Sequence, residues 1–258
     1  MRHTYPAPEP MDLDVKVHAG DLRITAGPVT EVVIDGMTGR GDSAPELEVS
    51  ADASRITVRE PRQGATLLGL RRKIDIEIQV PERSTLNASS GSGDIVLTGR
   101  FGRLEVTTGS GDVLVDQIAE QSTLTSGSGD VNVGRVLAPL TLRAASGDAT
   151  VTEIWAPSRL KVGSGDAVVR SVHADLQATS GSGDVRLDAV HAGELDLRTG
   201  SGDATIGVPQ AVAVWADVQA TTGSVTNRLT SRGMPAEGQA RVSISALLGT
   251  GSAVLRDA

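Results

Sequence analysis

Residues Ser126–Val131 read Ser-Gly-Ser-Gly-Asp-Val, and residues Ser180–Val185 repeat the same six letters. The centre of this stretch is Ser-Gly-Asp followed by a small or β-branched residue, and it recurs with spacings of 18, 18, 18, 18, 18 and 19 residues. A fixed period of this length indicates a repeat architecture, in which each unit buries its apolar side by stacking on the next. The aspartates of the repeat are Asp94, Asp112, Asp130, Asp148, Asp166, Asp184 and Asp203.

Two pairs of apolar positions flank each aspartate. Pairs such as Val131 and Val133 follow it by one and three residues, and pairs such as Leu140 and Leu142 precede it by eight and six. Alternation with period two is typical of a strand with one buried face. Each repeat is therefore predicted to hold two short strands. Glycines supply the turn between them, because glycine adopts positive φ without steric cost.

The sequence thus predicts an all-β fold, a parallel β-solenoid with about 18 residues per coil. Neighbouring coils would lie about 4.8 Å apart, so that equivalent positions form columns along the stack. A thin core suits short side chains, in agreement with a chain that is 39% hydrophobic and only 2% aromatic. A right-handed coil is expected from the general preference of parallel connections.

The repeat divides the chain into four segments. They are a flexible N-terminal arm (1–10), a degenerate N-terminal β-strand region (11–85), the regular array (86–207) and degenerate C-terminal coils with a cap (208–258). Altered ends are expected because a regular terminal coil would expose strand edges. The leucine-containing loop at 61–72 is expected to cover an edge, and residues 242–255 are expected to form the final coil.

The composition excludes several classes of function. The net charge is −8, with 24 basic and 32 acidic residues, so no nucleic-acid partner is expected, because phosphate backbones bind basic faces. The absence of cysteine excludes disulfides and thiolate metal sites. The sequence shows no signal peptide and no apolar run long enough to cross a bilayer. We therefore expect a cytoplasmic protein without direct membrane insertion.

The seven aspartates are predicted to point outward and to form a ridge at one turn of the solenoid. Neighbouring carboxylates about 4.8 Å apart would repel one another by roughly 0.9 kcal/mol in water. We expect each carboxylate to offset this repulsion by accepting backbone N–H bonds within its own turn, helped by the serine two residues earlier. A calcium ion between coils is the alternative, but one aspartate per turn offers few of the six to eight oxygens that calcium prefers.

A second column lies seven residues after each aspartate. It contains Phe101, Ala119, Leu137, Trp155, His173 and His191. Registration would align the rings of Phe101, Trp155, His173 and His191 on one ledge, which is a candidate binding site because exposed aromatic side chains are typical anchors of interfaces. Ring stacking that only shields the core beneath the corner is the other interpretation, and it is the one that we favour from the sequence.

His173 and His191 would be neighbours in this column. With Asp175, Asp188 or Glu194 they could form a weak zinc or nickel site, since imidazole and carboxylate both suit these ions. The alternative is a pair of exposed histidines brought together only by the repeat, and this is the interpretation that we adopt. Their titrations would be coupled, and like charge would disfavour protonation of both rings.

The repeat also resembles a known family. The turns Ser126–Val131 and Ser180–Val185, the early Ala19–Ile24 and the closing Trp215–Val218 and Thr222–Leu229 resemble the bacterial β-strand-repeat proteins known as "putative adhesins", which are related to the toast-rack domains of envelope-stress systems. The resemblance implies a right-handed parallel β-solenoid and a link to envelope-stress signalling. It implies no catalytic residues.

Together these features favour a non-enzymatic scaffold that binds a protein partner or self-associates, without a cofactor. No serine lies in a nucleophile elbow with a paired histidine and acid. One alternative is a surface adhesin stabilised by calcium. The other is a β-helix enzyme that acts on polysaccharides with ridge carboxylates, which would require a cleft and a break in the regular pattern.

Overall fold

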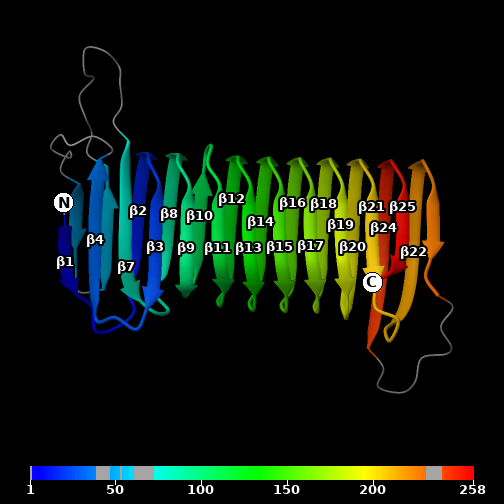
Figure 1. Cartoon of the computed structure of the whole chain (residues 1–258), viewed down its shortest axis with the longest axis horizontal. Helices are drawn as coiled ribbons and strands as arrows, with labels where there is room; N and C mark the ends of the chain where they lie inside the picture. The colour runs from blue at the N-terminus through cyan, green and yellow to red at the C-terminus, as the bar shows by residue number, and fades with distance from the viewer. Residues whose placement is uncertain (1, 39–46, 53, 61–72, 231–239) are drawn as a thin grey trace, which may run out of the picture. The chain divides into compact units, whose positions relative to one another are not determined.

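The computed structural model describes residues 2–38, 47–52, 54–60, 73–230 and 240–258 (Figure 1). Within them the chain forms 25 strands and no helix, which confirms the predicted all-β class. It divides into two compact units, residues 1–129 and 130–258. The described residues contain no helix with the length and apolar character that a membrane crossing requires. The loop at 61–72 lies outside the described residues.

Unit 1 has two layers of strands. One layer has the order β1-β4-β7-β3-β9-β11, and the other has the order β12-β10-β8-β2-β6-β5. The strands are β1 (Arg2–Pro6), β2 (Asp12–Ala19), β3 (Leu22–Gly27), β4 (Glu31–Thr38), β5 (Glu48–Ala51), β6 (Arg55–Arg59), β7 (Ile74–Pro81), β8 (Thr85–Ser92), β9 (Ile95–Arg100), β10 (Leu104–Thr108), β11 (Val113–Ile118) and β12 (Ser122–Ser128).

Unit 2 repeats this two-layer plan. Its layers have the orders β13-β15-β17-β19-β21-β25-β23 and β22-β24-β20-β18-β16-β14. The strands are β13 (Val131–Val136), β14 (Leu140–Ser146), β15 (Ala149–Ile154), β16 (Ser158–Ser164), β17 (Ala167–Val172), β18 (Leu176–Ser182), β19 (Val185–Val190), β20 (Gly193–Ser201), β21 (Ala204–Val208), β22 (Ala213–Thr222), β23 (Val225–Arg228), β24 (Arg241–Thr250) and β25 (Ala253–Asp257).

Successive coils stack in register, as a solenoid requires. In unit 2, β15 and β17 pair in parallel, with Ala149 opposite Ala167 and Val151 opposite Val169. All four side chains are at most 1% exposed, so they fill the core between the layers. The repeat of 18 residues is thus one coil with one strand in each layer. The predicted solenoid is confirmed.

The glycine before each aspartate is required by the close stacking of the turns. Gly183 has a φ of 154°, and a Cβ built there would lie 2.1 Å from the carbonyl oxygen of Gly165 in the preceding coil. Any other residue would therefore meet backbone that cannot move aside, in a conformation that side chains disfavour. This contact explains why the glycine recurs with the period of the coil.

The order of coils in space differs from the order in the chain at both ends. The first strands, β2 and β3, lie between β6 and β8 and between β7 and β9 respectively. The last strands, β24 and β25, lie inside β22 and β23. The outermost coil of unit 2 is therefore formed by 213–228, and the expectation that residues 242–255 form the final coil is wrong. Buried Ile244 and Leu255 explain the exchange, because this coil is the more apolar of the two.

The N-terminal residues do not form the expected flexible arm. Strand β1 pairs antiparallel with β4, with Tyr5 opposite Val32, and β4 pairs antiparallel with β7. Ala7 and Met11 are buried. The edge of β4 offers unpaired backbone groups that β1 satisfies, which favours order over a free arm.

Candidate functional site

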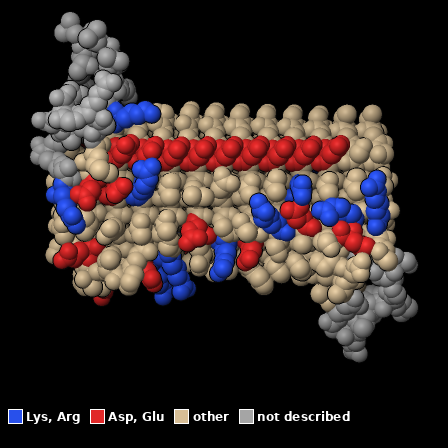
Figure 2. Space-filling model, in the orientation of Figure 1, with Lys and Arg blue, Asp and Glu red and all other residues tan. Residues whose placement is uncertain are grey.

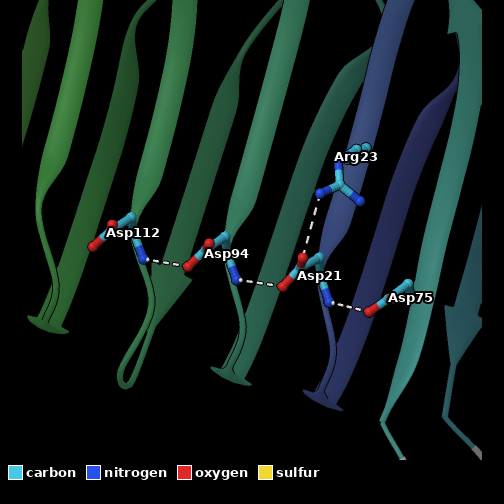
Figure 3. A network of polar contacts seen from close by, with 5 residues as sticks. All are labelled: Asp21, Arg23, Asp75, Asp94 and Asp112. Carbon is cyan, nitrogen blue, oxygen red and sulfur yellow. Dashed lines mark hydrogen bonds and ion pairs between the residues drawn. The ribbon is translucent and has the colours of Figure 1, made fainter. Parts of the chain in front are cut away.

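In unit 1 the aspartate ridge is a ladder of hydrogen bonds between coils (Figure 3). The backbone N–H of Asp112 donates to Oδ1 of Asp94 at 3.0 Å, and that of Asp94 donates to Oδ1 of Asp21 at 3.3 Å. The N–H of Asp21 donates to Oδ1 of Asp75 at 2.9 Å, while the guanidinium of Arg23 donates to Oδ2 of Asp21 at 3.3 Å. Asp21 and Asp75 thus extend the ridge beyond the seven predicted residues. The apolar residues one and three positions after each of them carry the signal.

Unit 2 contains the same ladder, and Figure 2 shows the row of acidic side chains on the face in view. In every rung the N–H of one coil donates to Oδ1 of the aspartate in the coil before it. The pairs are Asp148 to Asp130 (2.9 Å), Asp166 to Asp148 (2.8 Å), Asp184 to Asp166 (2.8 Å), Asp203 to Asp184 (2.8 Å) and Ser252 to Asp203 (2.7 Å). The expected bonds within each turn are replaced by bonds to the next coil, because stacking in register places that N–H beside the carboxylate.

The ladder accounts for the tolerance of a row of like charges. A hydrogen bond to a charged acceptor contributes about 1.5–3 kcal/mol net, against roughly 0.9 kcal/mol of repulsion per neighbouring pair in water. Among the residues that the structure describes, no three His, Cys, Asp or Glu side chains are grouped as a metal site would need. Every rung repeats the same contact, so no pair of carboxylates is distinguished as acid and base.

Three rings of the second column form a stack in unit 2. Trp155, His173 and His191 follow strands β15, β17 and β19. The ring centroids of Trp155 and His173 lie 3.8 Å apart, those of His173 and His191 lie 4.4 Å apart, and both pairs deviate from parallel by 4°. Trp155 remains 52% exposed. The repeat therefore presents a large aromatic side chain that is held in one orientation.

Phe101 does not belong to an exposed ledge. It lies in unit 1 and is 1% exposed. Between β9 and β11 the register shifts, with Gln117 opposite Arg100, and Gly99 has a φ of 95°. This bulge inserts one residue, so that Phe101 takes the inward position that Ile118 occupies in the next coil. The sequence signal was Arg100, a charged residue where the regular spacing requires an apolar one.

The polar contacts of the stack keep its rings in place. The indole Nε1 of Trp155 donates to Oε2 of Glu153 at 3.1 Å, and the hydroxyl of Ser171 lies 2.8 Å from Nε2 of His173. Burial lowers the pKa of His173 below its ordinary value, and the neighbouring His191 lowers it further, while Glu153 acts in the opposite direction. The stack therefore favours a neutral imidazole at its centre.

The carboxylates near the two histidines are engaged elsewhere. Oδ1 of Asp175 accepts the N–H of Glu194 at 2.9 Å. Oδ1 of Asp188 accepts Nε of Arg186 at 2.6 Å and lies 3.8 Å from the guanidinium of Arg256. These contacts engage the carboxylates with other partners, and the suggested zinc or nickel cluster does not form among the described residues.

A groove of about 320 Å³ lies over the first residues of β14, β16, β18 and β20, in the layer opposite the strands that carry the stack, and none of the three rings lines it. Pro157 and Asp175, each two residues beyond a stacked ring, are among its lining residues. On its floor Nε of Arg159 donates to Oε1 of Gln177 at 2.6 Å, and Nε2 of Gln177 donates to Oδ2 of Asp196 at 3.2 Å. Sequence reasoning missed this network. Its signal is a column of polar residues, spaced by 18 and 19, on the outer face of the strands.

The sequence profile of the Toastrack DUF4097 family matches residues 11–256. The chain belongs to this family. The match extends over nearly all of the Toastrack chain, including both ladders and the ring stack, whereas strand β1 lies before the matched residues. It agrees with the family resemblance carried by the Ser-Gly-Asp turns. A comparison with curated proteins finds no match to this Toastrack chain.

The chain is also similar to several solved structures. A "putative cell adhesion protein" from Clostridium sporogenes is 12% identical, with 100% of this chain and 99% of that chain covered and a TM-score of 0.26. A "putative lipid binding protein" from Parabacteroides distasonis is 11% identical, with 99% and 96% covered and a TM-score of 0.42. A "putative adhesin" from Parabacteroides merdae is 10% identical, with 99% and 95% covered and a TM-score of 0.42.

Proposed function

We propose that this Toastrack chain is a non-enzymatic scaffold that binds a protein partner at the ring stack of unit 2 and at the neighbouring groove, which begins two residues beyond the stacked rings. The observation that carries the proposal is Trp155, a large aromatic side chain that is half exposed yet fixed by stacking on His173 and by its bond to Glu153. A side chain that is ordered before binding loses little conformational entropy on binding. Aromatic anchors of this kind dominate many interfaces.

The chemistry of the corner indicates the kind of partner. Trp155 and Pro157 offer apolar surface, and Asp175 and Glu194 place carboxylates along the groove. The third carboxylate of the groove, Asp196, is paired with the guanidinium of Arg198, and Arg159 is the one basic residue among the described lining residues. We infer a partner segment with an apolar side chain flanked by lysine or arginine, because complementary charge guides encounter and orientation. The net charge of −8 likewise favours a positively charged partner segment. A place in envelope-stress signalling stays a prediction.

The test begins with a pull-down that identifies a partner and continues with the two purified proteins. Replacement Trp155→Ala is expected to weaken binding about tenfold or more, as is typical for loss of an aromatic anchor. The matched control is Leu114→Ala, which removes an equally exposed apolar side chain from unit 1. Equal affinity of wild type and Trp155→Ala, or equal losses in the two variants, would contradict the proposal.

The role of the acidic side chains is tested separately. Asp175→Asn combined with Glu194→Gln is expected to slow association and to reduce its dependence on salt, because steering depends on net charge. Association rates measured at low and high ionic strength would show this. An unchanged salt dependence would contradict the basic character of the partner segment, but not the role of Trp155 as the aromatic anchor.

A further inference from the structure

Unit 2 ends in a coil that nothing covers on its outer side within the described residues. Strand β22 pairs with β24, and β23 pairs with β25. Both are the last strands of their layers, so their other edges offer unpaired N–H and C=O groups. Strand β22 is ten residues long. An edge of this length is a template for pairing with another strand.

The inner face of this coil is open as well. In β22 the inward positions lie opposite Val242, Ile244, Ala246 and Leu248, which are all at most 3% exposed. The inward residues themselves are Val214, Ala216, Val218 and Ala220, of which Ala216 is exposed and the other three are half-buried. In β23 the inward residues are Val225, opposite fully buried Ala253, and the polar Asn227, opposite buried Leu255, and both are exposed, Val225 by 46%. The apolar core of unit 2 therefore reaches solvent at this end.

We propose that this end binds the same end of a second copy of the chain. A two-fold axis normal to the two layers would place β22 antiparallel to β22 of the second copy and β23 antiparallel to β23. Such a rotation keeps the inward faces inside, so Val218 and Val225 of both copies would enter one continuous core. The interface is isologous and closes as a dimer without further growth.

The sequence of β22 is compatible with pairing to itself. Two registers near the middle of β22 keep the inward residues of both copies facing the core. One is centred on Val218 and the other on Asp217. The register with Val218 opposite its own equivalent places Ala216 opposite Ala220 inside, and Asp217 opposite Gln219 outside. The Gln219 amide already donates to Asp217 in its own strand at 3.2 Å. Because the amide has a second N–H, it can also donate to Asp217 of the second copy across the interface.

The other central register would place Asp217 opposite its own equivalent and is disfavoured by like charge. The two strands contain one acidic residue, Asp217, and one basic residue, Arg228. This low charge favours association of two identical ends, since charged side chains are the usual protection of an edge strand. A second copy therefore fits this end better than a strongly charged partner.

The first test is sedimentation of the full chain across concentration. Wild type is expected to be a dimer at about 10 μM, and Val218→Lys is expected to raise the dissociation constant about a hundredfold or more, because it would bury two ammonium groups side by side. The matched control is Gln219→Lys, which points outward and faces Asp217 of the second copy, so its dimer is retained. A monomeric wild type, or a dimeric Val218→Lys chain, would overturn the proposal.

A second variant covers the case in which Val218→Lys does not fold. The chain contains no cysteine, so Val218→Cys introduces a single thiol. Directly opposed residues in an antiparallel pair are close enough for a disulfide, and oxidation is expected to link two copies. Thr221→Cys, which faces Trp215 of the second copy, is expected to stay unlinked. Equal linking of both variants, or none, would contradict the register.

This inference is independent of the proposed partner site. Trp155→Ala is expected to leave the dimer intact, and Val218→Lys is expected to leave partner affinity unchanged. A failure of one proposal is thereby distinguished from a failure of the other.

Discussion

The N-terminal end of unit 1 and the C-terminal end of unit 2 both end in a strand edge beside the apolar core. They differ in how this edge is protected. At the first end, β4 turns antiparallel, short β1 covers it with Pro6, and Val32 and Ile34 beneath are fully buried. At the second end a long parallel strand is outermost, and Val225 opens the core to solvent. Within the described residues, unit 1 thus covers its terminal edge, whereas unit 2 leaves its terminal edge available for the contact proposed above.

The largest effect is expected when the closed end is opened. Deletion of residues 1–6 would expose the edge of β4 and the side chains beneath β1, at a cost of about 2–4 kcal/mol, as is typical when buried apolar contacts are lost. Urea denaturation would measure the loss, and sedimentation would reveal new association. An unchanged stability would show that β1 is not the cap of unit 1.

The aspartate ladder of unit 2 also differs near the open end, where its last N–H donor belongs to the uncharged Ser252. Asp203→Ala would leave the N–H of Ser252 without its acceptor and is expected to cost about 1–2 kcal/mol. Asp203→Asn should recover most of this, since an amide oxygen still accepts. Denaturation midpoints and hydrogen exchange at the Ser252 amide would test it. Equal losses in the two variants would assign the effect to packing instead of the hydrogen bond.

The smallest effect is expected in the ring stack, which lies in the middle of the repeats of unit 2. Because the pKa of His173 is lowered in the folded chain, the unfolded chain binds the proton more readily. The contribution of this ring to stability is therefore present above the ordinary histidine pKa of about 6.5 and is lost as pH falls through the lower folded value. Denaturation between pH 8 and pH 5 should show a shallower loss for His173→Phe. Identical profiles would contradict the assignment.

The regular array was predictable because every coil repeats the same inward pattern. Val151 and Val169 follow their aspartates by three residues, and the structure pairs them. The two ends were not predictable in the same way. The position of β24 inside β22 depends on which of two weak coils buries more apolar surface, and β1 depends on a partner strand far along the chain.

The candidate sites were predictable only as columns. Spacing alone aligns Trp155 with His173, but it does not reveal the bulge that turns Phe101 inward. It also does not show that an aspartate such as Asp166 bonds to the next coil and not to its own turn. The first outcome depends on one inserted residue and the second on where the backbone N–H of the neighbouring coil lies, and a periodic pattern contains neither. The exposure of Val218 was not predictable either, because it depends on β22 being the last strand of its layer among the described residues.

The most direct test of the difference between the ends compares two single-cysteine chains. Val218→Cys places a thiol on the outermost strand of the open end, and Thr4→Cys places one on the outermost strand of the closed end, where Thr4 is exposed. After mild oxidation at equal concentration, we expect a disulfide-linked dimer for Val218→Cys and a monomer for Thr4→Cys. Linking of Thr4→Cys to the same extent, or a monomeric Val218→Cys chain, would contradict it.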